Sequence, residues 1–268
     1  MQARRLVLRP ATRVRRGRRV ADPSSDGPHE RLWLFDLDNT LHDTSHAIFP
    51  RIDHGMTQAV SETLGVDIDT ANELRRRYWK RYGATMIGLM RHHGVDPHGF
   101  LLRSHDFDVA PLVRAERGLP RALRALTGRK VLLTNAPLHY AKAVLRHLGI
   151  LHHFNSLWGI EEMRLHGEFR PKPSPALLHH ALAREGVPAA RAVLVEDTLA
   201  NLRAERRVGL RTVHVYHPGT PFSKGDSQRP AYVDLRVNSV RDLLLGRRPL
   251  RGKSGSGSAG NGGGQSGE

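Results

Sequence analysis

Cysteine is absent from the 268 residues of this chain. Neither a disulfide framework nor a thiolate metal site can therefore form, and the composition fits a reducing compartment, so we expect a cytoplasmic protein. Long apolar runs are also missing: none approaches the roughly 20 residues of a membrane-spanning helix, so we expect no membrane partner. The arginine-rich N-terminus lacks the apolar segment of a secretory signal. The length suits one domain with an insertion, or two small domains.

Acidic residues are outnumbered, with 26 Asp and Glu against 42 Lys and Arg, which gives a net charge of +16. Residues 1–30 hold eight arginines and three acids. Proline and glycine interrupt any helical or strand periodicity there, at Pro10, Gly17, Pro23 and Pro28. We interpret these residues as a disordered arm; a targeting peptide and a nucleic-acid-binding arm are the alternatives. The overall charge suits an anionic substrate or a polyanion, or it makes a basic surface without a specific partner.

The stretch from Leu32 to Leu41 organises the rest of the chain. Four apolar residues lead into Asp36 and Asp38, and Thr40 follows two residues later. A short apolar run bounded by charge is typical of a strand buried on both faces of a parallel sheet, and ligands bind at the carboxyl ends of such strands. Two acids this close repel each other unless a cation lies between them or one holds a proton. The pair therefore predicts chemistry at this point, and an acidic turn without chemistry is the other interpretation.

Strand and helix patterns alternate after residue 118, which predicts βαβ units and a Rossmann-like parallel sheet of the α/β class. The expected strands cover residues 31–38, 130–134, 154–160, 192–195 and 211–216, and the expected helices cover residues 119–126, 140–148, 174–184 and 199–208. Residues 231–245 are predicted to add a last strand and helix. The core domain would then comprise residues 31–43 and 118–245, followed by a flexible Gly/Ser-rich tail at 246–268.

Residues 44–117 carry a helical pattern without strands. Apolar residues recur at four-residue spacing from Ile52 to Leu64, and again from Leu74 through Met86, with Leu89 and Met90 near the end of the second run, which predicts two helices. Residues 97–103 suit another short helix. An inserted helical domain between two parts of the α/β core is therefore expected.

Four short motifs follow one another at domain-like spacing: Phe-Asp-Leu-Asp-Asn-Thr-Leu at 35–41, Leu-Leu-Thr-Asn-Ala at 132–136, Arg-Pro-Lys-Pro at 170–173 and Val-Leu-Val-Glu-Asp-Thr at 193–198. In this order they resemble the signatures of the haloacid dehalogenase-like (HAD) phosphohydrolases, over about residues 31–245. The resemblance implies a HAD core domain and identifies the helical insertion at 44–117 as a cap. A cap would act as a lid that excludes water and chooses the substrate.

The resemblance also implies roles for residues in these motifs. Asp36 would attack phosphorus and form an aspartyl-phosphate, and Asp38 would protonate the leaving oxygen and then take a proton from water. Thr134, Asn135 and Lys172 would bind the phosphoryl group, through a hydroxyl, a backbone amide and a positive charge. Taken alone, Thr134 is also a candidate helix N-cap, and Lys172 is also a candidate solvated loop lysine. Because Asp38 supplies an acid that halide departure does not use, dehalogenation is not expected.

A carboxylate that attacks a phosphate dianion requires a cation, and Mg²⁺ suits carboxylate and phosphate oxygens. The resemblance implies ligation by the carboxylate of Asp36, the backbone carbonyl of Asp38 and the carboxylate of Asp197. Glu196 would orient its neighbours or bind the metal through water. Asn201, one helical turn further on, could hydrogen-bond the acidic pair.

The substrate would be chosen by the cap, where residues 48–52, 82–85 and 88–94 resemble the pyrimidine 5′-nucleotidase branch. His42 departs from that pattern, since an aromatic residue is common there. Candidate substrate contacts are Phe49, Tyr82, Arg91, His92 and His105, each of which also suits a cap core or cap surface. We therefore predict a Mg²⁺-dependent phosphatase of nucleoside 5′-monophosphates, UMP or CMP. The alternatives are a phosphatase of phosphoglycolate or a sugar phosphate, and a nucleic-acid-binding protein that uses the basic arm.

Overall fold

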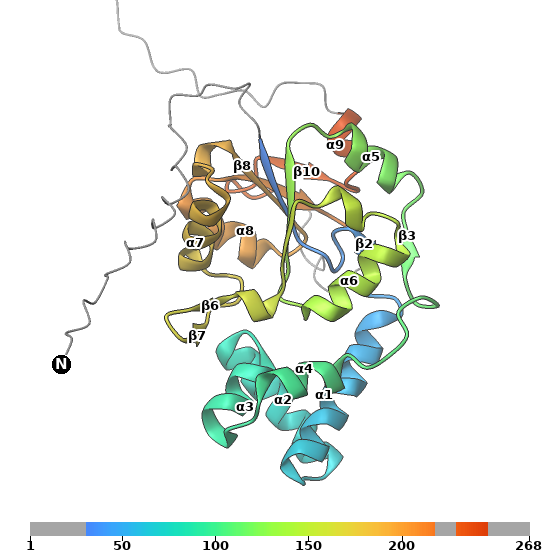
Figure 1. Cartoon of the computed structure of the whole chain (residues 1–268), viewed down its shortest axis with the longest axis vertical. Coiled ribbons are helices and arrows are strands. Elements are labelled where there is room, and N and C mark those ends of the chain that lie inside the picture. Colours follow the sequence, from blue (N-terminus) through green and yellow to red (C-terminus); the bar gives the residue numbers. More distant parts are fainter. Residues whose placement is uncertain (1–30, 218–228, 246–268) are drawn as a thin grey trace, which may run out of the picture.

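A parallel six-stranded sheet forms the centre of the computed structural model (Figure 1), with the strand order β10-β9-β8-β1-β4-β5. The structure describes residues 31–217 and 229–245, so the predicted arm and tail lie outside the described residues. The strands of the sheet are β1 (Leu32–Phe35), β4 (Arg129–Leu133), β5 (Ser156–Trp158), β8 (Ala192–Glu196), β9 (Arg211–Val215) and β10 (Leu235–Val237). The predicted α/β class with a Rossmann-like sheet is confirmed.

Helices cover both faces of the sheet, which is why β1 is apolar along its whole length. Trp33 and Phe35 of β1 face one apolar cluster, and Leu32 and Leu34 face the other. The first cluster is covered by α5 (Leu119–Ala125), α6 (Leu138–His147) and α9 (Asp242–Leu245), and the second by α7 (Pro175–Glu185) and α8 (Leu199–Glu205). With both faces buried, the carboxyl edge of the sheet is the place where β1 can present polar side chains.

Three elements of the sheet domain are clearly shorter than predicted. The strand expected at residues 31–38 is confined to β1, which ends at Phe35, and the strand expected at 154–160 is confined to β5. The helix expected at 199–208 ends as a 3₁₀ turn (Arg206–Val208). Gly209 then adopts a left-handed conformation with φ of 97°. A tightened last turn before such a glycine satisfies the free carbonyls at a helix end.

Four helices lie together below the sheet domain in Figure 1, and we call them the four-helix insertion: α1 (Ile48–Leu64), α2 (Ile68–Tyr82), α3 (Thr85–His93) and α4 (Pro97–Ser104). They pack around an apolar cluster of their own. The chain enters and leaves them through β2 (His42–Asp43) and β3 (Arg114–Ala115), which pair antiparallel. The domain boundaries at residues 44 and 117 stay a prediction.

The single helix predicted from Leu74 to about Met90 is wrong, because the chain turns at Gly83. Gly83 has a φ of 79°, a left-handed conformation that ends α2, and Met86 belongs to α3. The two helices then pack closely: a Cβ added at Gly88 would lie 2.1 Å from the ring of Tyr78. The spacing continued through residue 86 because both helices bury their apolar faces in the same cluster.

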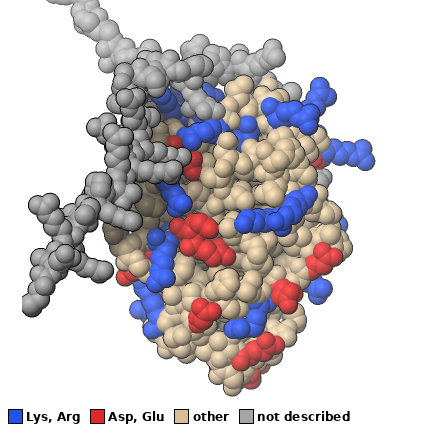
Figure 2. Space-filling model, viewed as in Figure 1, with Lys and Arg blue, Asp and Glu red and all other residues tan. Residues whose placement is uncertain are grey.

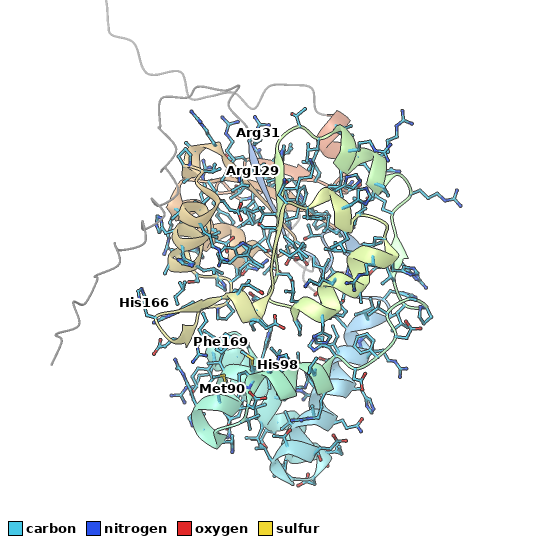
Figure 3. The ribbon with its side chains drawn as sticks, viewed as in Figure 1. Arg31, Met90, His98, Arg129, His166 and Phe169 are labelled. Carbon is cyan, nitrogen blue, oxygen red and sulfur yellow. The ribbon has the colours of Figure 1, made fainter. Side chains whose placement is uncertain are left out.

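A small hairpin, which the sequence did not predict, extends from the sheet domain and contacts the insertion. It comprises β6 (Arg164–Leu165) and β7 (Glu168–Phe169), joined by His166 and Gly167 with φ of 50° and 85°. Phe169 extends toward the four-helix insertion and packs against its apolar cluster (Figure 3). The hairpin therefore fixes the segment that leads directly into Lys172.

Basic and acidic side chains lie among one another on the surface of the insertion that faces the viewer in Figure 2. In the part of the chain that the structure describes, no helix has both the length and the apolarity needed to cross a bilayer.

Candidate active site

Asp36 and Glu196 lie side by side because β1 and β8 are parallel and end at the same edge of the sheet. The backbone amide of Asp36 donates to the carbonyl of Val195 at 3.0 Å, which extends the ladder by one residue and sets Asp36 beside Glu196. On the other side of β1, Thr134 directly follows β4 and is buried. Three of the four motifs therefore meet at one edge.

Lys172 brings the remaining motif, Arg-Pro-Lys-Pro at 170–173, to this edge. Its Nζ donates to Asp36 Oδ1 at 2.8 Å and to Glu196 Oε2 at 2.7 Å, and the residue is 2% exposed. The side chain of Asn135 holds the Lys172 backbone by two hydrogen bonds of 2.8 Å, one from Nδ2 to the carbonyl and one from the amide to Oδ1. Asn135 thus fixes the lysine loop with its side chain, a contact that the sequence analysis missed. Its backbone amide has no acceptor within the described residues, so the predicted phosphoryl contact is still open to it.

Three carboxylates lie around this lysine. Oxygen atoms of Asp36, Glu196 and Asp197 all lie within 4.8 Å of one another. Burial and the nearby Glu196 raise the pKa of Asp36 to about 7, although Lys172 opposes the shift, and the same two causes raise the pKa of Asp197 well above its ordinary range. One buried lysine does not balance two buried acids and a third that is half-buried, and hard carboxylate oxygens with excess negative charge fit Mg²⁺.

Glu196 is the least available of these carboxylates for a metal. Its Oε2 accepts from Lys172, and its Oε1 accepts from the backbone amide of Thr198 at 3.2 Å. Asp197 has fewer contacts than Glu196: the Thr198 hydroxyl donates to its Oδ1 at 3.0 Å. These contacts suit the predicted division, with Asp197 as a ligand and Glu196 as a residue that orients its neighbours.

Asp38 receives its contacts on one oxygen. The Tyr140 hydroxyl donates to Oδ1 at 2.8 Å, the Thr44 hydroxyl donates to it at 3.0 Å, and His42 Nε2 lies 3.2 Å away. Burial alone would raise the pKa of Asp38, but the contacts from His42, Tyr140 and Thr44 outweigh it and lower that pKa. His42, the departure from the family pattern, is thus part of the site.

Two other predicted residues lie near the site with fewer contacts. The hydroxyl oxygen of Thr134 accepts from the Ala136 amide at 3.1 Å, which leaves its proton free to donate. Asn201 on α8 is 8% exposed. The structure shows no hydrogen bond from the Asn201 side chain to Glu196 or Asp197, so that predicted contact is not made.

The five residues predicted to contact substrate do not form one group in the structure. Tyr82, Arg91 and His92 form one group on the insertion: the Tyr82 hydroxyl lies 2.7 Å from His92 Nε2, and the Arg91 guanidinium lies 5.3 Å from the Tyr82 ring centre. Arg91 also lies 4.0 Å from Glu168 in the hairpin. The group therefore lies against the hairpin that leads into Lys172.

His105 lies instead beside Asp38, and Phe49 packs against the apolar cluster under α6. The His105 ring centre is 5.5 Å from that of Tyr140. Burial lowers the pKa of His105 to about 4, although the charge of Asp38 opposes the shift, so this ring is neutral at physiological pH. Of the five candidates, His105 is the one whose ring lies against Tyr140, the donor to Asp38.

The family model for haloacid dehalogenase-like hydrolases matches residues 31–209. The chain belongs to the haloacid dehalogenase-like hydrolases. The predicted family is confirmed.

Several curated proteins are similar to this HAD-like hydrolase. Phosphate metabolism protein 8 of Saccharomyces cerevisiae is 26% identical over 74% of this chain, and the match spans 64% of the yeast protein. The phosphoglycolate phosphatase of Pseudomonas syringae is 25% identical over 82% of this chain and 80% of its own. The 5′-nucleotidase of Pseudomonas aeruginosa is 26% identical over 79% of this chain and 94% of its own, which fits the predicted branch.

Solved structures share the fold. The crystal structure of a HAD phosphatase from Thermococcus onnurineus covers 81% of this chain and 98% of its own, with a TM-score of 0.56 and 19% identity. CbbY from Rhodobacter sphaeroides, solved in complex with phosphate, covers 80% and 96%, with a TM-score of 0.56 and 21% identity. The fold of this HAD-like hydrolase is therefore that of both structures.

Sequence reasoning missed two buried polar residues of this HAD-like hydrolase, Tyr140 and Glu205. Tyr140 was predicted only as the first residue of the helix at 140–148; a tyrosine near the start of the helix after the second motif was the available signal. Glu205 lies on α8 and is fully buried, and neither carboxylate oxygen has a hydrogen-bond partner among the described residues. An acid among the apolar positions of a helix was its signal.

Glu205 should make the protein less stable as the pH rises. Burial raises the pKa of Glu205 to about 8, and Glu196 and Asp36 add to the shift while Lys172 opposes it. Between the ordinary pKa of 4.5 and about 8, the unfolded chain has released this proton and the folded chain keeps it, so stability falls as the pH rises, by about 1.4 kcal/mol per pH unit at most.

We therefore expect Glu205→Gln to raise the melting temperature at pH 8 and to change it little at pH 4.5. Thermal unfolding measured from pH 4.5 to 8.5 in chelator checks this, with the exposed Glu62→Gln as the matched control. Parallel curves for Glu205→Gln and the wild type would rule out the shift.

Proposed function

We propose that this HAD-like hydrolase is a Mg²⁺-dependent phosphatase that cleaves phosphate monoesters through an aspartyl-phosphate. The observation that carries the proposal is the position of Lys172, buried between Asp36 and Glu196 with Asp197 beside them. A phosphate dianion repels a carboxylate nucleophile, so the site must supply positive charge next to that nucleophile. A buried lysine and a cluster of hard oxygen ligands supply it.

Asp36 is the nucleophile in this proposal. One of its carboxylate oxygens attacks phosphorus, and the bond from phosphorus to the ester oxygen breaks. That oxygen keeps the electron pair and receives a proton from Asp38, which has first taken this proton from the monoanionic form of the bound ester. Asp38 then removes a proton from water, and the water attacks the phosphorus of the aspartyl-phosphate. The bond to Asp36 breaks, and phosphate and the free carboxylate result.

The remaining motif residues hold the phosphoryl group. Lys172 offsets the charge of Asp36 and of the phosphoryl oxygens, and Thr134 and the Asn135 amide can donate to those oxygens. Mg²⁺, held by Asp36, Asp197 and the Asp38 carbonyl, would neutralise the charge that develops on the phosphoryl oxygens. Asn135 contributes in addition by fixing Lys172.

We infer that the substrates are nucleoside 5′-monophosphates, with UMP and CMP preferred. The four-helix insertion serves as the cap, and Tyr82, Arg91 and His92 offer a flat ring with donors beside it, which suits a base and a ribose. The relative from Pseudomonas aeruginosa that carries the name 5′-nucleotidase supports this class. The partner is then a small cytoplasmic metabolite.

Phosphoglycolate is the second candidate, because the relative from Pseudomonas syringae that covers 82% of this chain is named a phosphoglycolate phosphatase. A small carboxylate substrate would need one cationic group in the cap, and Arg91 could serve. The alternative of a nucleic-acid-binding protein rests on residues 1–30, which lie outside the described residues.

Release of free phosphate from UMP, CMP, AMP, phosphoglycolate and p-nitrophenyl phosphate tests the proposal. We expect turnover that needs Mg²⁺ and stops in EDTA, with kcat/KM for UMP and CMP at least about tenfold above that for phosphoglycolate, a difference of roughly 1.4 kcal/mol. Arg91→Ala should raise KM for UMP and leave p-nitrophenyl phosphate unchanged. A preference for phosphoglycolate would favour the second candidate, and the absence of turnover on all five esters would reject the phosphatase.

A further inference from the structure

Tyr140 connects α6 to the loop after β1. The residue is 1% exposed, and its hydroxyl donates to Asp38 Oδ1 at 2.8 Å. Thr44 and His42 contact the same oxygen, at 3.0 Å and 3.2 Å. The structure shows no hydrogen bond to the other oxygen, Oδ2, from any residue that it describes. The contacts on Asp38 are therefore one-sided.

Two of the groups that contact Asp38 Oδ1 are more deeply buried than Asp38 itself. The side chain of His42 is fully buried and Thr44 is fully buried, whereas the side chain of Asp38 is 20% exposed. A carboxylate oxygen with three close contacts has its lone pairs occupied, so it cannot readily accept another proton. Oδ2 is then the oxygen of Asp38 that can exchange a proton with a bound substrate.

The structure holds Tyr140 firmly in this position. Its ring packs against Phe107, with ring centres 6.1 Å apart, and against His105. The first amide of α6, that of Leu138, donates to the carboxylate of Glu161 at 3.0 Å. A phenol keeps its proton at neutral pH, so the Tyr140 hydroxyl acts as the donor in the 2.8 Å contact to Asp38 Oδ1.

We infer that Tyr140 is a positioning residue, which holds Asp38 by Oδ1 and thereby turns Oδ2 toward the leaving-group oxygen. The inference rests on the proposed phosphatase function. In the first step, Oδ2 passes to the ester oxygen the proton that it took from the monoanionic phosphate ester, as the phosphorus–oxygen bond breaks, and in the second it takes a proton from water. A carboxylate that turns freely would place Oδ2 correctly only part of the time.

The dependence on the leaving group tests this role. An alkyl ester such as UMP needs a proton on its departing oxygen, whereas p-nitrophenolate leaves without one. In Tyr140→Phe, the first-turnover release of uridine from UMP, or of the alcohol from the best alkyl ester of the panel, should slow about tenfold or more. The burst of p-nitrophenol should change less than about threefold, and KM for both esters should hold. Rapid-quench and stopped-flow measurements on the full-length protein with Mg²⁺ give these rates.

Two variants serve as comparisons. Tyr78→Phe deletes a hydroxyl that also makes a 2.7 Å contact, to His93 in the four-helix insertion, and should leave both rates unchanged. Thr44→Val removes another donor to Oδ1 and should repeat the leaving-group effect, even if Tyr140→Phe does not fold.

Equal slowing of both esters in Tyr140→Phe and Thr44→Val, or no slowing of either, would overturn the inference. If the wild type hydrolyses no ester, the proposed phosphatase function fails first, and the two failures are thereby distinguished.

Discussion

Asp36→Asn is expected to abolish turnover, with kcat lowered by about a thousandfold or more. The amide is a far weaker nucleophile than the carboxylate, and no other described carboxylate takes the same place: Glu196 is held by Lys172 and Thr198, and Asp38 is held by its own donors. The fold should survive, because an amide oxygen can still accept from Lys172 and because burial already raises the pKa of Asp36 to about 7.

The covalent route gives this prediction a second readout. Wild-type protein quenched in acid during turnover should carry an acid-stable, hydroxylamine-sensitive phosphate on the peptide that contains Asp36, and Asp36→Asn should carry none. Asp69→Asn, at an exposed acid on α2, is the matched control and should match the wild type in both measurements. Normal hydrolysis by Asp36→Asn would show that this residue is not the nucleophile.

The central part of the site could be predicted from the sequence, because a parallel sheet imposes it. Strands that run in the same direction end at one edge, so the polar residues after β1, β4 and β8 had to meet there. Asp36, Thr134 and Asp197 needed only the correct strand boundaries, and those boundaries are marked by the change from apolar to polar residues. The order of the strands was not needed for that step.

Residues that reach the site from helices and loops could not be predicted in the same way. Tyr140 is 102 residues from Asp38, and the side chain of Asn135 is 37 residues from Lys172, so no local spacing predicts either contact. Both depend on the path of the chain after a strand ends, which is set by packing. His105 was chosen for its residue type, and its place beside Asp38 depends on how the chain returns from the insertion.

The turn at Gly83 shows the same limit within the insertion. Helical spacing continued across it, because the residues on both sides face one cluster, and only the left-handed Gly83 and the extended Ala84 separate α2 from α3. A glycine followed by alanine and threonine was the available signal. Spacing alone identifies the buried face of a helix better than its end.

Lys172→Met is expected to lower the free energy of unfolding by about 3–5 kcal/mol and to abolish turnover. Lys172 is the buried cation between Asp36 and Glu196, and its removal leaves two close carboxylates unpaired in a site where Asp197 adds a third. The same acids raise the pKa of Lys172, so the lysine is charged throughout the usual range of pH. The wild-type ion pairs therefore persist wherever the acids are ionised.

The pH dependence of this loss separates a charge effect from a packing effect. Without the lysine, the pKa of Asp36 should rise further, because the group that lowers it is gone. An acid whose pKa is raised in the folded state keeps its proton there at low pH, so at low pH it does not lower the free energy of unfolding. As the pH rises through that pKa, the free energy of unfolding of the protein falls. The destabilisation by Lys172→Met should therefore be smaller at pH 5 than at pH 8 in urea unfolding. Lys80→Met, at an exposed position of α2, is the control and should show little loss at either pH. A loss of equal size at both pH values would mean that Lys172 stabilises the site by its packing and not by its charge.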